Sequence, residues 1–108
     1  MAKYTKVLTG ELNQIKEKIK SGIMQGSISA SLEDSYDYND GVVRCSVLVF
    51  ERYSYSGGNR VSMNVTLIQR NDGNVQLCAI TSGGSQATFF KLNTWGEEAF
   101  LQKLKEIV

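Results

Sequence analysis

The sequence predicts an α+β domain in which an antiparallel meander sheet carries two helices on one face. Apolar and polar residues alternate with the period of a strand at 43–49, 61–67 and 75–79. Turn-forming residues bound these stretches. Asn39-Asp40-Gly41 precedes the stretch at 43–49, and Asn71-Asp72-Gly73 separates the stretches at 61–67 and 75–79. Two further segments carry apolar residues at helical spacing. Consecutive strands with tight turns pair antiparallel, and one-sided helices share a core, so the predicted order is β-α-β-β-β-β-α.

The first helix is expected near 10–24, after a short strand at 2–8. Thr9 is its predicted N-cap, and its apolar stripe consists of Leu12, Ile15, Ile19 and Ile23. The second helix is expected near 94–107, where Thr94 and Glu97 match a capping box. The four strands between the helices are expected near 27–38, 42–55, 60–70 and 74–81. For residues 82–93 the pattern leaves open whether the sheet continues or the chain is irregular.

The pairing of the two central strands decides which of their side chains face the helices. The valine pattern places the odd-numbered residues of both strands on the inner face, so paired positions have even sums. A five-residue loop then pairs Tyr55 with Val61. The same pattern places Cys45 on the inner face and Cys78 on the outer face. Because a disulfide needs converging side chains, we expect two free thiols.

The composition is that of a globular chain of 108 residues, which predicts a single domain over residues 1–108. Twelve basic and eleven acidic residues give a net charge of +1, which is unlike a nucleic-acid-binding surface. No apolar stretch has the length of a membrane span or a signal peptide, so we expect a cytoplasmic protein. The chain has no histidine, the commonest general base and metal ligand. We therefore expect no catalytic residue, no metal and no cofactor.

The outer face of the sheet is the predicted functional surface. With even-sum pairing, Leu48 and Phe50 fall on that face beside Ile68 and Ile80, with Arg52 among the polar residues around them. An apolar centre with a polar rim is typical of a protein contact, and a two-fold dimer commonly buries such a patch. We therefore predict a non-catalytic binding or assembly module, with a homodimer or a partner site centred on Phe50 and Leu48.

The alternative is a small-molecule site between the helices and the sheet. With odd-numbered residues inward, Glu51 follows Val47 and Val49 on the inner face and precedes Tyr53 and Tyr55. An inward carboxylate near apolar side chains has its charged form disfavoured, and such groups cluster at functional sites. The opposing interpretation is that the sheet has reached its rim at position 51, where Glu51 meets solvent or a basic residue.

Three stretches of the chain stand out together. They are Gly26-Ser27-Ile28-Ser29-Ala30-Ser31, Glu51-Arg52-Tyr53, and Ser82-Gly83-Gly84-Ser85-Gln86-Ala87 leading to Thr94-Trp95-Gly96-Glu97-Glu98. Together they resemble a family of small bacterial proteins of unknown function, over nearly the whole chain. Because that family has no assigned activity, the resemblance implies no functional residue.

The strand order also resembles two known architectures. It is similar to the TATA-binding-protein-like fold, whose members often bind partners through the sheet face. It is more loosely similar to the Bet v 1-like fold, which holds apolar ligands between sheet and helix. Proteins with the same fold can have many different functions. These resemblances therefore imply where a site would lie and imply no activity.

Overall fold

A computed structural model describes residues 1–27, 29–53, 60–83 and 90–108 of the chain. The predicted α+β order is confirmed, with one five-stranded antiparallel sheet and two helices. The elements are β1 (Ala2–Leu8), α1 (Leu12–Gly26), β2 (Ser31–Asn39), β3 (Val43–Tyr53), β4 (Arg60–Arg70), β5 (Val75–Gly83) and α2 (Phe90–Ile107).

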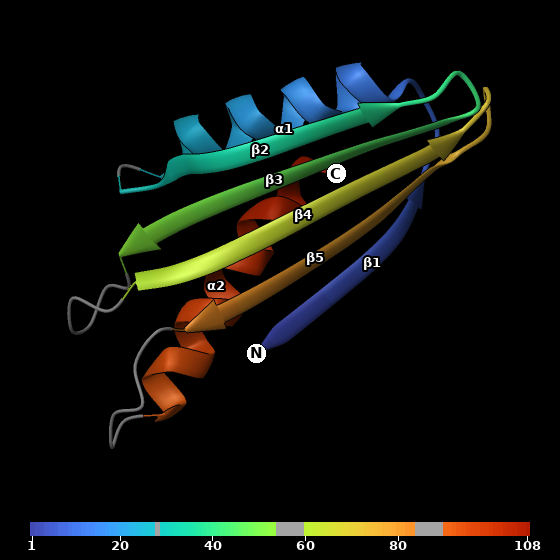
Figure 1. Cartoon of the computed structure of the whole chain (residues 1–108). Coiled ribbons are helices and arrows are strands. Elements are labelled where there is room, and N and C mark those ends of the chain that lie inside the picture. Colours follow the sequence, from blue (N-terminus) through green and yellow to red (C-terminus); the bar gives the residue numbers. More distant parts are fainter. Residues whose placement is uncertain (28, 54–59, 84–89) are drawn as a thin grey trace.

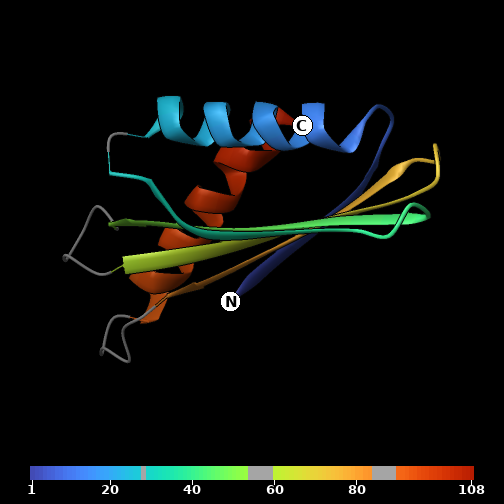
Figure 2. The ribbon, with the colours of Figure 1, turned by 45° about the horizontal axis from the view of Figure 1, so that its top comes forward.

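The strands lie in the order β1-β5-β4-β3-β2, so β4 is the middle strand and β1 and β2 are the two edges (Figure 1). Strands β2 to β5 form the predicted meander, and β1 pairs antiparallel with β5. Both helices lie on one side of the sheet (Figure 2), where α2 crosses behind the strands and α1 lies across α2. The other side of the sheet carries no described element.

Helix α1 is fixed at its first turn by Glu11, which replaces Thr9 as the N-cap. The Glu11 carboxylate accepts hydrogen bonds from the backbone N–H groups of Asn13 and Gln14, at 2.8 and 3.2 Å. Gly10 precedes it with a φ of 128°, a conformation that favours glycine. The prediction of Thr9 was wrong because the chain turns at Gly10 before the helix begins.

The last turns of the two helices lie very close together. A Cβ atom built on Gly22 would lie 2.5 Å from Cδ1 of Ile107, so the absence of a side chain at Gly22 permits the contact. Leu12, Ile19 and Ile23 are buried on the predicted stripe of α1. Phe100, Leu101 and Leu104 are their counterparts on α2, and the predicted stripes of both helices are therefore confirmed.

Helix α2 begins at Phe90, four residues before the predicted start, so the capping box at Thr94 was wrong. Glu97 lies inside the helix and is buried. One oxygen of its carboxylate accepts a hydrogen bond of 2.6 Å from the backbone N–H of Gly83, and the other lies 2.7 Å from the amino group of Met1. Glu97 thus joins α2 to the end of β5 and to β1.

The register of β3 differs from the prediction by three residues, since Val61 pairs with Arg52. Paired positions of β3 and β4 sum to an odd number, as in Phe50 with Met63 and Leu48 with Val65. The odd-numbered residues of β4 and β5 face the helices as predicted, whereas in β3 the even-numbered residues do so. The predicted partner Tyr55 lies outside the described residues. The larger side chains Leu48 and Phe50 fill the core, where both are almost completely buried.

Candidate functional site

The outer sheet face is the side of the sheet that neither helix covers (Figure 2). Cross-strand pairing arranges the middle of this face in three rows, each of which crosses all five strands. Glu51 with Ser62 and Ser82 continues the face at one end, and Val43 with Arg70 continues it at the other. In the order β1, β5, β4, β3, β2, the Asn64 row is Lys3, Ile80, Asn64, Val49 and Asp34. The Thr66 row is Thr5, Cys78, Thr66, Val47 and Tyr36. The Ile68 row is Val7, Gln76, Ile68, Cys45 and Tyr38.

The centre of the outer sheet face is uncharged and carries exposed apolar side chains. Ile68 and Ile80 are 42% and 39% exposed, and Val47 and Val49 beside them are half-buried. Tyr36 and Val7, at the two edges, are more exposed at 64% and 54%. Lys3 and Asp34 carry the only charges among the three rows, and they stand at opposite ends of the same row. Polar side chains, Asn64 and Thr66 on β4 and Gln76 on β5, lie between these apolar ones. Exposed apolar side chains gathered on one sheet face are characteristic of a contact site.

The structure divides the residues predicted for the interface between the two faces of the sheet. Ile68 and Ile80 lie on the outer sheet face, whereas Leu48 and Phe50 lie beneath α2 in the core. Arg52 also faces α2, with its guanidinium carbon 4.8 Å from the centre of the Phe100 ring. These three were misplaced because both faces of β3 are rich in apolar residues, so alternation alone does not choose between them.

The residues that the prediction missed are the valines of β3 and two tyrosines of β2. Val47 and Val49 replace Leu48 and Phe50 on the outer sheet face, and Tyr36 and Tyr38 extend the apolar surface to the edge. Side-chain size was the available signal. Large Leu and Phe side chains fill a core under a helix better than valine, which suits a pleated surface.

Glu51 does not lie between the helices and the sheet, so the predicted inward carboxylate is wrong. It lies on the outer side of β3, where its Oε1 forms an ion pair of 2.6 Å with the guanidinium of Arg60. The Ser62 hydroxyl is 3.5 Å from the other oxygen. Tyr53 is exposed, with the same guanidinium 5.6 Å from the centre of its ring. Tyr55 lies outside the described residues.

Both cysteines are free thiols and both lie half-buried on the outer sheet face. The prediction of opposite faces was wrong, because the shifted register of β3 turns Cys45 outward. Strand β4 lies between them, and two strand spacings separate their Cα atoms by roughly 10 Å, beyond the reach of a disulfide. The reactivity of the two thiols should therefore fall when another molecule covers this face.

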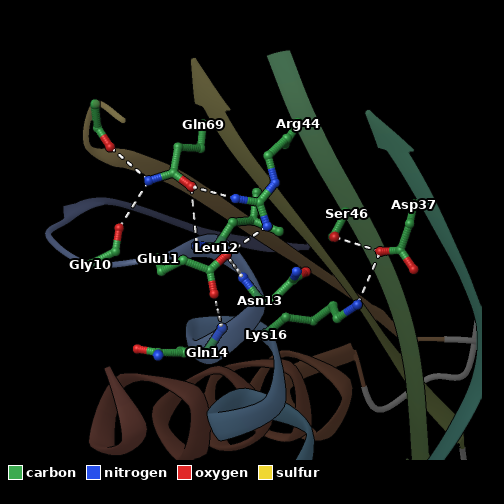
Figure 3. A network of polar contacts seen from close by, with 11 residues as sticks. Gly10, Glu11, Leu12, Asn13, Gln14, Lys16, Asp37, Arg44, Ser46 and Gln69 are labelled. Atoms are coloured by element: carbon green, nitrogen blue, oxygen red, sulfur yellow. Dashed lines mark hydrogen bonds and ion pairs between the residues drawn. The ribbon is translucent and has the colours of Figure 1, made fainter. Parts of the chain in front are cut away.

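On the helix side, Gln69 of β4 ties the start of α1 to the sheet (Figure 3). Its side chain is almost fully buried, and its amide nitrogen donates to the carbonyl oxygens of Gly10 and Gly73 at 2.9 and 2.8 Å. Its amide oxygen accepts from the backbone N–H of Leu12 at 3.1 Å. Beside it, Arg44 forms an ion pair of 2.6 Å with Glu11.

A cleft of about 220 Å³ opens beside this network, between α1 and the strands β2 and β3. Asp37 lies in it and accepts hydrogen bonds from the Ser46 hydroxyl at 2.6 Å and from Lys16 at 3.3 Å (Figure 3). These contacts, the Ser46 bond first, lower the pKa of Asp37. The Glu11 pKa is lowered by the backbone N–H of Asn13 and by Arg44. Asp37, Ser46 and Lys16 are thus already paired with one another in the cleft.

A second hollow of about 320 Å³ lies at the β1 edge, next to Thr9 and Val108. Lys6 borders it and donates a hydrogen bond of 2.7 Å to the carbonyl oxygen of Val108. Within the described part of the chain, His, Cys, Asp and Glu form no group of three that could hold a metal ion. No described helix is both long and apolar enough to cross a membrane.

Comparison with known proteins identifies a family but no activity. No curated protein and no solved structure matches the chain. A model of a family of unknown function matches residues 1–108, which is the whole chain. This match agrees with the resemblance found in the sequence. The chain therefore belongs to DUF6054, a family of unknown function.

Proposed function

We propose that this protein is a non-catalytic assembly module whose outer sheet face packs against a second copy of the chain. The observation that carries the proposal is the uncovered centre of that face with its exposed apolar side chains, where Ile68 lies diagonally across from Val47 on the neighbouring strand. Both helices are on the other side of the sheet (Figure 2). Burying such side chains against a similar surface removes apolar area from water, which favours association.

The size of the face suits a stable dimer. Five strands spaced by about 4.8 Å, with a mean length of about nine residues, give a flat area of roughly 800 Å². A standard interface buries about that much on each partner. Pairing of two β2 edges is a poorer route, since Glu33, Asp34 and Asp37 would meet like charges and the register shift after Leu32 interrupts the edge.

A small-molecule function has less support. The cleft beside Asp37 measures about 220 Å³, below the range of about 300–1,000 Å³ typical of ligand pockets, and the hollow at the β1 edge, at about 320 Å³, lies only at the lower end of that range. A polar ligand there would have to displace Ser46 or Lys16 from Asp37. The free thiols Cys45 and Cys78 are also compatible with a reducing compartment, so we place the assembly in the cytoplasm.

Sedimentation equilibrium over a range of concentrations tests the proposal. The wild-type chain should sediment as a dimer, and Ile68→Glu should shift it to a monomer because the carboxylate would be buried in the contact. Met24→Glu is the matched control, since Met24 is similarly exposed, at 44%, on α1. This variant should remain dimeric. A wild-type monomer at high concentration, or an Ile68→Glu dimer as tight as wild type, would overturn the proposal.

A further inference from the structure

We infer that the sheet edges form a second contact, in which β1 of one copy pairs with β2 of another copy. This contact goes beyond the proposed function, because it uses the two edges of the sheet and leaves the outer sheet face free. The inference follows from the opposite charges of the two edges and from a register that brings these charges together.

Both edge strands are open to a further strand. β1 and β2 end the sheet on its two sides (Figure 1), and no described strand pairs with their outer edges. Such an edge carries unpaired backbone N–H and C=O groups that can continue the ladder with another chain. Every residue of β2 from Glu33 to Asn39 is exposed, as are Lys3 and residues 5–7 of β1.

Each edge strand carries charge of a single sign. β1 has Lys3 and Lys6 and no acidic residue, whereas β2 has Glu33, Asp34 and Asp37 and no basic residue. Pairing β1 with β1, or β2 with β2, therefore opposes like charges, and only β1 with β2 opposes unlike charges. The edges thus favour one occupant, a second copy of the chain that presents its other edge.

Strand direction fixes the sense of this pairing. β1, β4 and β2 run in the same direction because every neighbouring pair in the sheet is antiparallel (Figure 1). Two copies with their helices on the same side therefore join β1 parallel to β2. In a joined sheet, side chains of the outer sheet face must lie beside side chains of that same face.

One parallel register meets this condition and satisfies both lysines. Lys3 and Asp34 are on the outer sheet face, while Lys6 and Asp37 are on the helix side. Placing Lys3 beside Asp34 also brings Lys6 beside Asp37, on strands about 4.8 Å apart. A slip of two residues in either direction keeps the faces but separates both pairs.

The paired segments have equal length and are regular. Residues 3–8 of β1 would lie along residues 34–39 of β2, which is the part of β2 that follows the register shift after Leu32. The shift therefore ends the ladder without interrupting it.

The four charged groups have capacity for these pairs. Neither Lys3 nor Asp34 has an ion-pair partner among the described residues. Asp37 accepts from Ser46 and Lys16 through Oδ1 only, which leaves Oδ2 for a second cation. Lys6 donates one hydrogen bond, to the carbonyl oxygen of Val108, and an ammonium group has three donors.

The other charges near the edges leave the contrast in place. Beside β1, Lys105 adds positive charge next to Tyr4, and the buried Glu97 is bound to the amino group of Met1. Beside β2, Arg60 lies 3.9 Å from Glu33 but pairs more closely with Glu51, at 2.6 Å.

The antiparallel alternative, with the helices of the two copies on opposite sides, matches less well. Its best register pairs Lys6 with Asp37 and takes Lys3 to Asp40, which lies beyond the end of β2. The Asp40 carboxylate already accepts hydrogen bonds from the backbone N–H groups of Val42 and Val43, at 2.9 and 2.7 Å. The parallel register uses Asp34 instead, which lies within the strand.

Sedimentation velocity of Ile68→Glu tests the edge contact alone, because this change removes the contact of the proposed function. At about 0.01 M salt, where the Debye length is about 30 Å, the variant should form a concentration-dependent series of species larger than the monomer, since the contact repeats from copy to copy. At about 1 M salt, where the Debye length is about 3 Å, it should be a monomer. A folded Ile68→Glu chain that stays monomeric at low salt would overturn the edge contact.

Charge reversal in the Ile68→Glu background tests the register. Lys3→Glu and Asp34→Lys should each weaken association at low salt about fivefold, because each opposes like charges at one pair of every contact. An equimolar mixture of the two should recover the original association, since each chain then meets an opposite charge on both edges. The matched controls Lys103→Glu on α2 and Asp72→Lys in the turn after β4, both at exposed positions, should leave it unchanged. A mixture without recovery would overturn the parallel register.

Salt separates this inference from the proposed function. The contact between outer sheet faces is apolar at its centre and should persist at about 1 M salt, where the edge contact is lost. A wild-type dimer at high salt that grows no larger at low salt overturns the edge contact and leaves the proposed function intact. A wild-type monomer at high salt, with larger species at low salt, overturns the proposed function and supports the edge contact.

Discussion

The guanidinium of Arg52 lies over the ring of Phe100, with its central carbon 4.8 Å from the ring centre. Arg52 is half-buried there, and desolvation lowers the pKa of its side chain. The pair joins the last residues of β3 to α2 at the rim of the core. It also shows which face of β3 points toward the helices, since Arg52 can reach Phe100 only from the helix side of the sheet.

A double-mutant cycle on this pair should detect a favourable coupling. We expect Arg52→Gln and Phe100→Leu to couple by about 0.5–2 kcal/mol in urea unfolding, the range for a partly desolvated cation–π contact. The control cycle uses Arg60 and Tyr53, whose contact is longer at 5.6 Å and more exposed. That cycle should give a smaller value. Equal couplings in the two cycles would show that burial does not strengthen the Arg52 contact.

Truncation of β3 side chains should follow the odd-sum register. Phe50→Ala removes a fully buried ring and should lower the free energy of unfolding by about 3–5 kcal/mol. Ile68→Ala, measured by urea unfolding at the same low concentration, should cost less than about 1 kcal/mol because Ile68 is partly exposed. The reverse order of effects would mean that Phe50 points outward.

Gln69 should contribute much more to the free energy of unfolding than Gln76, an exposed glutamine on β5. Gln69→Leu leaves the N–H of Leu12 and the carbonyl oxygens of Gly10 and Gly73 without their side-chain partner. We expect a loss of at least about 2 kcal/mol in the free energy of unfolding. Gln76→Leu, on the outer sheet face, should change it by less than about 0.5 kcal/mol. Similar effects for both would contradict the anchoring role of Gln69.

Acid should destabilise the fold through three carboxylates. The pKa values of Glu11, Asp37 and Asp40 are all lowered; for Asp40 the causes are the backbone N–H groups of Val43 and Val42. A lowered folded pKa means that the unfolded chain binds more protons, so this stability is present above the unfolded pKa and is lost as pH falls through the folded pKa.

Thermal unfolding should therefore give a nearly constant melting temperature above about pH 5 and a decline below about pH 4. Asp40→Asn should lower stability near neutral pH and flatten the decline, because it removes one of the titrating groups. Asp72→Asn is the control, as Asp72 is exposed in the turn between β4 and β5. A decline of unchanged steepness in Asp40→Asn would exclude Asp40 as a contributor.

Local patterns in the sequence determined the elements of this protein, their order and the inner faces of both helices. The stripe from Leu12 to Ile23 and the alternation in β4 and β5 are each apolar on one side only, so each has one way to meet a core. The bare outer sheet face follows from the same patterns, because both helices are committed to the other side.

Tertiary structure decided the face of β3 and the contacts of single polar residues. Val47 and Val49 alternate with Leu48 and Phe50, so either face of β3 satisfies the alternation, and the choice depends on which side chains fill the volume beneath α2. Gln69 finds its partners at Gly10 and Leu12, and Glu97 finds Gly83, through contacts between separate elements. Local periodicity reports only on neighbours along the chain, whereas these partners meet only when β4, β5 and the helices have packed together.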